Sequence, residues 1–195
     1  MIPRHFQITI AFLLAAILLS GAYIIHLRQR EQAKAPAAAG SEPKAPAPTN
    51  FEHIRMLVAY DDDQALRWRE VVIGVPSSRD LRAREILRAL LALYVQNPSP
   101  HPLARSADVR EIYLVGNDTL LVDTTAGFAD GHPSGVLPEE LTLASVIETL
   151  AANVPGIKRV KFLVEGRERE TLAGHADLMS FYEVAAVHQL AKEFE

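Results

Sequence analysis

The sequence predicts an α+β domain, in which a mixed or antiparallel sheet carries two helices in the order ββαββαββ, preceded by a transmembrane helix and a linker. An apolar run of about 20 residues near the start has no formal charge, and an Ala/Pro-rich stretch follows it. Beyond that stretch, short runs rich in β-branched residues alternate with two segments of helical periodicity. We therefore expect an N-terminal tail at 1–5, a membrane anchor at 6–27, a linker at 28–50, the domain at 51–184 and a C-terminal tail at 185–195.

The apolar run extends from Phe6 to Ile25 and matches the length of a helix that spans a bilayer. Ser20, Gly21 and Ala22 have the spacing of a signal-peptide cleavage site, but the apolar run continues beyond them. This continuation favours an uncleaved signal-anchor over a cleaved secretory signal. The chain has no cysteine, so a lipid-modified cysteine is excluded and membrane attachment depends on a peptide segment.

The stretch from Ala33 to Thr49 has low complexity, and its prolines favour an extended, semi-rigid spacer. Basic residues flank the anchor unequally, because Arg4 precedes it whereas Arg28, Arg30 and Lys34 follow it. Counted alone, this distribution places the C-terminal domain in the cytoplasm. Many N-terminal anchors nevertheless insert with a short N-terminus inside, so the charges leave both orientations open.

Two strands and a helix begin the domain. Strands are expected at His53–Tyr60 and Trp68–Val75, joined by the polar turn Asp61–Asp63. Ser77 fits the N-cap of a helix whose apolar residues recur at helical spacing as far as Val95.

The second half repeats this order. The loop Gly127–Gly135 leads to a helix that starts near Pro138 and ends before Pro155, with an apolar stripe along one side. The other elements expected are strands at Val109–Val115, Thr119–Thr124, Lys158–Val164 and Glu168–Leu172, and a short amphipathic helix within Ala185–Glu195.

The charge of the domain bears on its partners. The whole chain has a formal net charge of -4, and the part from Glu52 onward has 15 basic and 22 acidic side chains. A domain this acidic lacks the basic footprint of a nucleic-acid-binding protein, so we expect no nucleic-acid partner. A cationic protein surface remains compatible with it.

Two loop histidines suggest a metal-binding hypothesis. Asp130, His132 and His175 are of residue types that bind metal ions, but their spacing is that of ordinary turn residues, which we favour. No GxSxG motif and no phosphate-binding GxxxxGK[ST] motif is present. We therefore predict no catalytic residue and no cofactor.

Two small basic clusters and one loop are candidates for contact with a partner. The first cluster lies on the first predicted helix, the second on one face of a predicted strand, and the loop precedes the second helix. These candidates are Arg79, Arg84, Arg88, Arg159, Lys161, Gly131, His132 and Gly135.

The second half carries a series of short motifs. They are Val122-Asp123, Glu139 to Leu141, Thr149-Leu150, Asn153 to Pro155, Val160 to Gly166, and Thr171 to Leu178. In this combination they resemble the GerMN domain, named from sporulation and spore-germination proteins. The resemblance covers about residues 52–184 and is specific in the second half. It departs from the family at Ser134-Gly135-Val136, where family members often have a Gly-Gly-Ser sequence.

The resemblance implies a non-enzymatic interaction or structural domain of the cell envelope, tethered to the cytoplasmic membrane with its C-terminal domain on the extracytoplasmic side. An envelope protein or the cell wall is the expected partner. One alternative is a metal-assisted envelope hydrolase using His132 and His175 with Asp123 and Asp130. Another is a scaffold that assembles through self-association.

Overall fold

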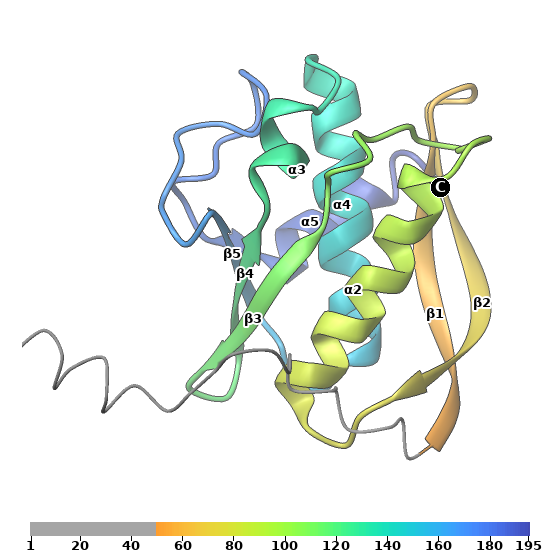
Figure 1. Cartoon of the computed structure of the whole chain (residues 1–195), viewed down its shortest axis with the longest axis vertical. Helices are drawn as coiled ribbons and strands as arrows, with labels where there is room; N and C mark the ends of the chain where they lie inside the picture. Colours follow the sequence, from red (N-terminus) through yellow and green to blue (C-terminus); the bar gives the residue numbers. More distant parts are fainter. Residues whose placement is uncertain (1–49) are drawn as a thin grey trace, which may run out of the picture. The chain divides into compact units, whose positions relative to one another are not determined.

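A computed structural model of the chain describes residues 50–195, and these confirm the α+β class (Figure 1). Apart from Asn50, the predicted tail, anchor and linker lie outside the described residues. Within residues 50–195, no helix combines the length and the apolar character needed to cross a membrane. The elements are β1 (Asn50–Tyr60), β2 (Ala65–Val75), α2 (Arg79–Val95), β3 (Val109–Val115), β4 (Thr119–Thr124), α3 (Ala126–Asp130), α4 (Val136–Asn153), β5 (Arg159–Val164), β6 (Tyr182–Glu183) and α5 (Val184–Ala191).

The strands form two sheets, whereas the sequence predicted one. β1 and β2 make an antiparallel hairpin without a further strand, and β3, β4, β5 and β6 form a second sheet in that order. In the second sheet β4 and β5 are parallel, and the other neighbours are antiparallel. Figure 1 shows α2 and α4 between the hairpin and the second sheet. The prediction of a single sheet was wrong because helices separate its two halves.

The edge of β1 that faces away from β2 is closed by side chains. The peptide N–H of Arg55 donates to Oδ1 of Asn153 at 3.2 Å, and the Asn153 amide donates back to the Arg55 carbonyl at 2.6 Å. The N–H of Leu57 donates to Oγ1 of Thr149 at 2.9 Å. Asn153 thus bonds with Arg55 as a residue of a neighbouring strand does, and α4 occupies the place that another strand would take.

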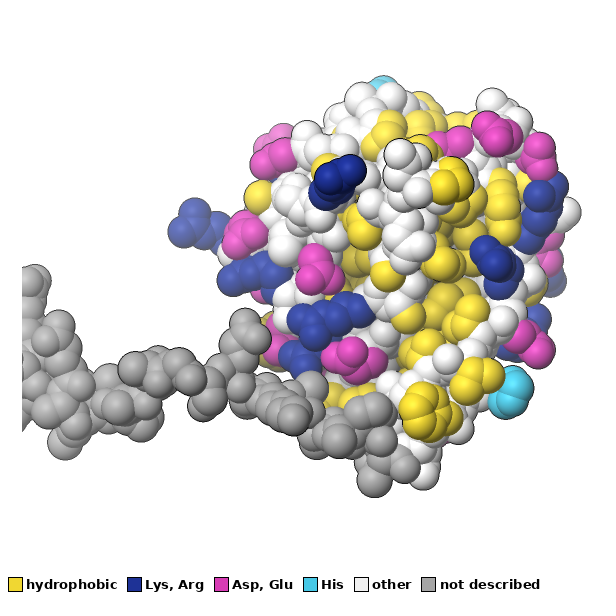
Figure 2. All heavy atoms as spheres, turned by 45° about the vertical axis from the view of Figure 1, so that its right-hand side comes forward, with side chains coloured by type: hydrophobic (Ala, Val, Ile, Leu, Met, Phe, Trp, Pro, Cys, Tyr) yellow, Lys and Arg dark blue, Asp and Glu magenta, His cyan; other side chains and the backbone are white. Residues whose placement is uncertain are grey.

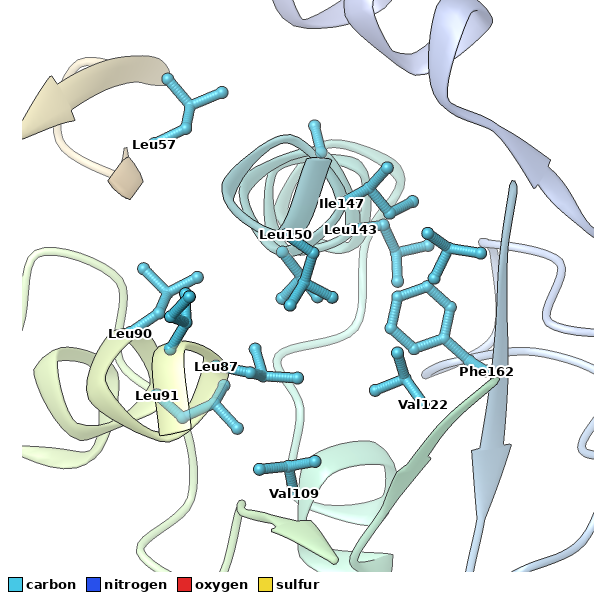
Figure 3. Packing of buried hydrophobic residues seen from close by; sticks show 14 of the residues in the cluster. Leu57, Leu87, Leu90, Leu91, Val109, Val122, Leu143, Ile147, Leu150 and Phe162 are labelled. Carbon is cyan, nitrogen blue, oxygen red and sulfur yellow. The ribbon is translucent and has the colours of Figure 1, made fainter. Parts of the chain in front are cut away.

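A hydrophobic core lies between α2, α4 and the two sheets (Figure 3). The figure shows leucines of α2 pointing toward α4, and α4 side chains pointing toward Val122 and Phe162 of the second sheet. The apolar stripe predicted for α4 is buried, and its members are Leu143, Ile147, Leu150 and Val154. The hairpin, α2 and α5 also contact α4, so its polar residues are buried as well and need partners inside the protein.

Beyond the division into two sheets, the structure differs from the prediction in three places. The expected strand at Glu168–Leu172 is a loop with a single bridge between Thr171 and Asp177. The strand that pairs with β5 is β6 instead. The loop Gly127–Gly135 contains the unpredicted α3, and the predicted C-terminal helix is present as α5. The loop at 168–178 is held by hydrogen bonds to α4, described below, rather than by a strand partner.

Candidate functional site

The carboxylate of Glu139, in the first turn of α4, is the most heavily hydrogen-bonded side chain of the described residues. It is fully buried. Oε2 accepts the backbone N–H groups of Ala173, His175 and Ala176 at 3.1, 3.1 and 2.8 Å. Oε1 accepts the N–H of Gly135 at 3.2 Å and Nδ1–H of His175 at 2.9 Å. One side chain therefore fixes the start of α4 to the loop that follows β5.

These donors determine the charge state of Glu139. Burial by itself would raise the pKa of its carboxyl group. The donors, with the Ala176 N–H and the His175 imidazole foremost, outweigh burial and lower the pKa from the ordinary 4.5 to about 2. Glu139 is thus ionised at neutral pH and acts as a hydrogen-bond acceptor for the loop, which is a structural role.

A chain of polar side chains joins the tip of the hairpin to α4. Oδ1 of Asp61 lies 2.5 Å from Nδ1 of His101, and Nε2 of His101 lies 2.5 Å from Oγ1 of Thr142. On the other side of this hydroxyl, Nε2 of His132 lies at 2.7 Å. His101 and Thr142 are fully buried. Burial lowers the pKa of His132, and a hydrogen bond to the Pro133 carbonyl opposes this shift.

The order of acid, imidazole and hydroxyl in this hydrogen-bonded series is that of an activated nucleophile. A substrate, however, cannot reach the hydroxyl. The Thr142 hydroxyl is inside α4, has an imidazole on each side, and also donates to the Pro138 carbonyl at 3.0 Å. A surface pocket of about 250 Å³ beside the chain is lined by Asp61 but not by His101 or Thr142. This series of hydrogen-bonded side chains therefore connects segments of the fold and presents no nucleophile to a substrate.

The residues of the metal hypothesis have separate partners. Asp130 forms an ion pair with Arg169 at 2.5 Å, Asp123 forms one with Arg110 at 3.1 Å, and His175 is hydrogen-bonded to Glu139. Among residues 50–195, no group of three or more His, Cys, Asp or Glu side chains is arranged to hold a metal ion. The four residues of the hydrolase alternative are thus not assembled into a metal centre.

Asp123 connects β4 to the turn after β5. Its Oδ1 accepts the N–H of Gly166 at 2.7 Å, and its side chain is almost completely buried. Gly166 has a φ of 72°, a left-handed conformation that glycine adopts without strain. The motifs Val122-Asp123 and Val160 to Gly166 therefore form a single contact that fixes the end of the second sheet.

The arginines of α2 do not form a free basic patch. Arg84 and Arg88 are four residues apart on α2 and share one helix face, but each forms an ion pair with a nearby glutamate. The internal partners are the Pro155 carbonyl at 2.5 Å for Arg79, Glu111 at 2.9 Å for Arg84 and Glu85 at 3.3 Å for Arg88. A partner that used these guanidinium groups would have to compete with these contacts.

The second basic cluster divides into one exposed and one buried residue. Arg159 is exposed, and its guanidinium lies 5.5 Å from the centre of the Phe181 ring. Lys161 is only 4% exposed and forms an ion pair with Glu168 at 3.1 Å. Little of Lys161 is therefore open to a partner, and its role as a contact residue stays a prediction.

The candidate loop before α4 is closely packed. A side chain on Gly131 would place its Cβ 2.4 Å from Cβ of Ala104, so only glycine fits there without a shift. Gly135 is the N-cap of α4, and its N–H is already bonded to Glu139. His132 is 7% exposed. Gly131 and Gly135 thus serve the close packing and the hydrogen bonding of the loop, and only a small part of the His132 side chain is open to a partner.

The short motifs thus correspond to a set of internal contacts. The family that these motifs resemble is also found by comparison with known families. The sequence profile of the family Germane, described as sporulation and spore germination, matches residues 58–170. The match covers more than half of the chain. This chain belongs to the Germane family.

Solved structures similar to this Germane chain have low sequence identity to it. A protein described as a lipoprotein from Clostridium perfringens has 15% identity and a TM-score of 0.46, covering 71% of this chain and 91% of that one. The tandem GerMN domains of the sporulation protein GerM from Bacillus subtilis have 14% identity and a TM-score of 0.48, covering 67% and 45%. The first GerMN domain of GerM alone has 14% identity and a TM-score of 0.43, covering 66% and 94%. No curated protein sequence matches this chain.

In this Germane domain, the polar motif residues Asp123, Glu139, Thr149 and Asn153 all bond to backbone groups distant in the sequence. Sequence reasoning identified the motifs without their partners. It also missed the series of hydrogen-bonded side chains that contains His101 and Thr142. The available signal was the set of polar residues along α4, which must find partners once the helix is buried on all sides.

Proposed function

We propose that this Germane chain is a non-enzymatic binding module of the cell envelope, tethered to the cytoplasmic membrane and with its domain on the extracytoplasmic side. The observation that carries the proposal is the internal use of its polar residues. Two sets of groups have suitable chemistry for catalysis. They are the Glu139 carboxylate and the hydrogen-bonded side chains of Asp61, His101 and Thr142, and both are occupied by partners inside the fold. An enzyme needs such groups at a site that a substrate can reach.

The arrangement of the chain supports the tether. An uncharged apolar segment at Phe6–Ile25 is followed by the Ala/Pro-rich segment Ala33–Thr49 and then by the compact domain. A spacer of this kind suits a domain that binds a partner at a distance from the bilayer. The family description, sporulation and spore germination, gives the processes in which that partner is to be sought.

Protease accessibility in spheroplasts tests the topology. Protease added outside should digest residues 50–195 of the full chain while a cytoplasmic control protein stays intact. Protection of the domain until the membrane is permeabilised would show that the basic residues after the anchor set the orientation, and that the domain is cytoplasmic.

Cross-linking in intact cells tests the binding role. We expect a specific envelope partner to be recovered with the full chain, and to be absent when the cross-linker is omitted. If no specific partner is recovered under conditions in which a known envelope complex is captured, the binding role is refuted.

A further inference from the structure

The outer edges of the two hairpin strands differ in their hydrogen bonding. Pairing runs without a bulge from Asn50 opposite Val75 to Tyr60 opposite Ala65. In such an antiparallel pair, alternate residues direct their N–H and C=O groups away from the partner strand. On β1 these outward residues include Arg55, whose backbone is bonded to α4 as described above.

The same register identifies the outward residues of β2. The N–H of Leu66 points outward and donates to the carbonyl of Phe194 at 2.7 Å, so the C-terminal segment covers the start of this edge. By alternation, the next outward backbone groups belong to Trp68, Glu70, Val72 and Gly74. No hydrogen bond joins the backbone of these four residues to any part of residues 50–195 outside the ladder with β1.

This open edge is extended and accessible. From Trp68 to Gly74 it is about 20 Å long at the usual rise per strand residue. Figure 1 shows β2 as the outermost element on its side of the domain. Val72 is 54% exposed and Phe51 is 77% exposed. Figure 2 shows exposed hydrophobic side chains on this side of the molecule, between charged ones. Donors and acceptors that alternate at this spacing match the backbone of another extended segment.

The charged residues on β2 indicate which side chains a strand added at this edge should carry. Arg69 and Glu70 are both exposed, and neither forms an ion pair with another of the described residues. They lie on opposite faces of the strand, so each would face a different side chain of an added strand. Val71, Val72 and Ile73 follow without a charge.

We propose that the edge of β2 from Trp68 to Gly74 binds an extended segment of a partner protein as an added antiparallel strand. That segment has an acidic residue opposite Arg69, a basic residue opposite Glu70, and β-branched residues opposite the apolar part of β2. The inference rests on the proposed binding function and names the surface and the partner chemistry for it.

A synthetic probe tests the chemistry. We would use a cyclic β-hairpin peptide, since closure keeps its strand extended before binding. Its exposed strand reads Thr-Val-Thr-Val-Lys-Asp-Thr, which in antiparallel pairing sets Lys opposite Glu70 and Asp opposite Arg69. A matched peptide with Lys and Asp exchanged sets like charges opposite each other. We expect the full-length chain to bind the first peptide at least roughly tenfold more tightly than the second.

Variants of the protein with the two charges exchanged test whether charge pairing causes the preference between the peptides. In the double variant with Arg69→Glu and Glu70→Arg, the preference between the two peptides should reverse. Val72→Pro removes an outward donor and should weaken binding of the first peptide at least roughly tenfold, because proline is tolerated on an edge strand but cannot donate. Val72→Thr keeps the donor and the β-branched shape, so it should bind as the wild type does. The near-ultraviolet circular dichroism of Trp68, the one tryptophan, reports whether the hairpin is intact.

The outcomes separate this inference from the binding function itself. No saturable binding of the first peptide, equal binding of both peptides, or no reversal in the double variant would each overturn the inference. Self-association of the chain that Val72→Pro abolishes would also overturn it, because a second copy would then occupy the edge. If the envelope partner still cross-links to the Val72→Pro variant as to the wild type, the binding function stands and the β2 edge is the wrong surface.

Discussion

Replacement of Glu139 by glutamine tests the structural role of the family motif. The side chain keeps its shape, but the charge is lost and one oxygen becomes an NH2 group. In the wild type, Oε1 accepts from Gly135 and His175, and Oε2 accepts three further N–H groups. An NH2 group cannot accept any of these donors, so at least one buried N–H loses its partner.

The magnitude follows from the pKa of Glu139. A fall from 4.5 in the unfolded chain to about 2 in the folded one corresponds to about 3 kcal/mol of stability. Because the folded pKa is the lower one, this stability is present in full above pH 4.5 and is lost as the pH falls toward 2. Glu139→Gln should therefore lower the free energy of unfolding by about 3 kcal/mol at pH 7, or the melting temperature by roughly 6–12 °C.

Urea denaturation followed by Trp68 fluorescence measures the effect, at pH 7 and in steps down to pH 2. The difference between wild type and Glu139→Gln should shrink steadily below pH 4.5. Glu140→Gln is the matched control, since the neighbouring Glu140 is only half-buried and its side chain forms no hydrogen bond within residues 50–195; its effect should stay below about 0.5 kcal/mol. A Glu139→Gln variant as stable as this control at pH 7 would refute the reasoning.

Three further substitutions test other contacts by the same denaturation assay. Asn153→Ala removes both hydrogen bonds to Arg55 and should cost about 1–3 kcal/mol; a wild-type midpoint would show that β1 needs no cover from α4. Tyr94→Phe leaves the buried N–H of Ala59 without the hydroxyl that accepts it at 2.8 Å, and should also cost about 1–3 kcal/mol, an expectation that a loss below about 0.5 kcal/mol contradicts. Phe162→Ala opens a cavity beside Phe128 and should cost about 3–5 kcal/mol, whereas a smaller loss would mean that the core closes around the gap.

Much of the fold was predictable from local pattern. The hairpin of β1 and β2, the helix α2, the hairpin of β3 and β4 and the helix α4 all appear close to their expected positions. Each is encoded by turn residues and by a period of two or of about 3.6 residues. The strand expected at Glu168–Leu172 is absent, because a short local pattern does not show whether a neighbouring strand exists to pair with it.

The site was predicted less well than the fold. His132 and His175 were considered as metal ligands and interpreted as ordinary turn residues, but the spacing of loop residues does not show which side chains meet in the fold. Lys161 was placed on one strand face with Arg159 as a candidate for contact with a partner, yet it is buried because the loop that contains Met179 covers it, and its ammonium donates to the Met179 carbonyl. Exposure of one sheet face depends on what later segments cover, which is a property of the whole fold.

The sequence by itself determined the α+β class, the Germane family and the positions of the main helices and strands, because local periodicity and short motifs encode these. Only the tertiary structure decided that the hairpin forms its own sheet and that the motif residues act as internal connectors. The hydrogen bonds responsible join residues 92 and 98 positions apart, as between Leu57 and Thr149 and between Arg55 and Asn153. Such pairs form when apolar burial brings α4 against β1, and buried backbone groups then take whichever polar side chain lies within reach.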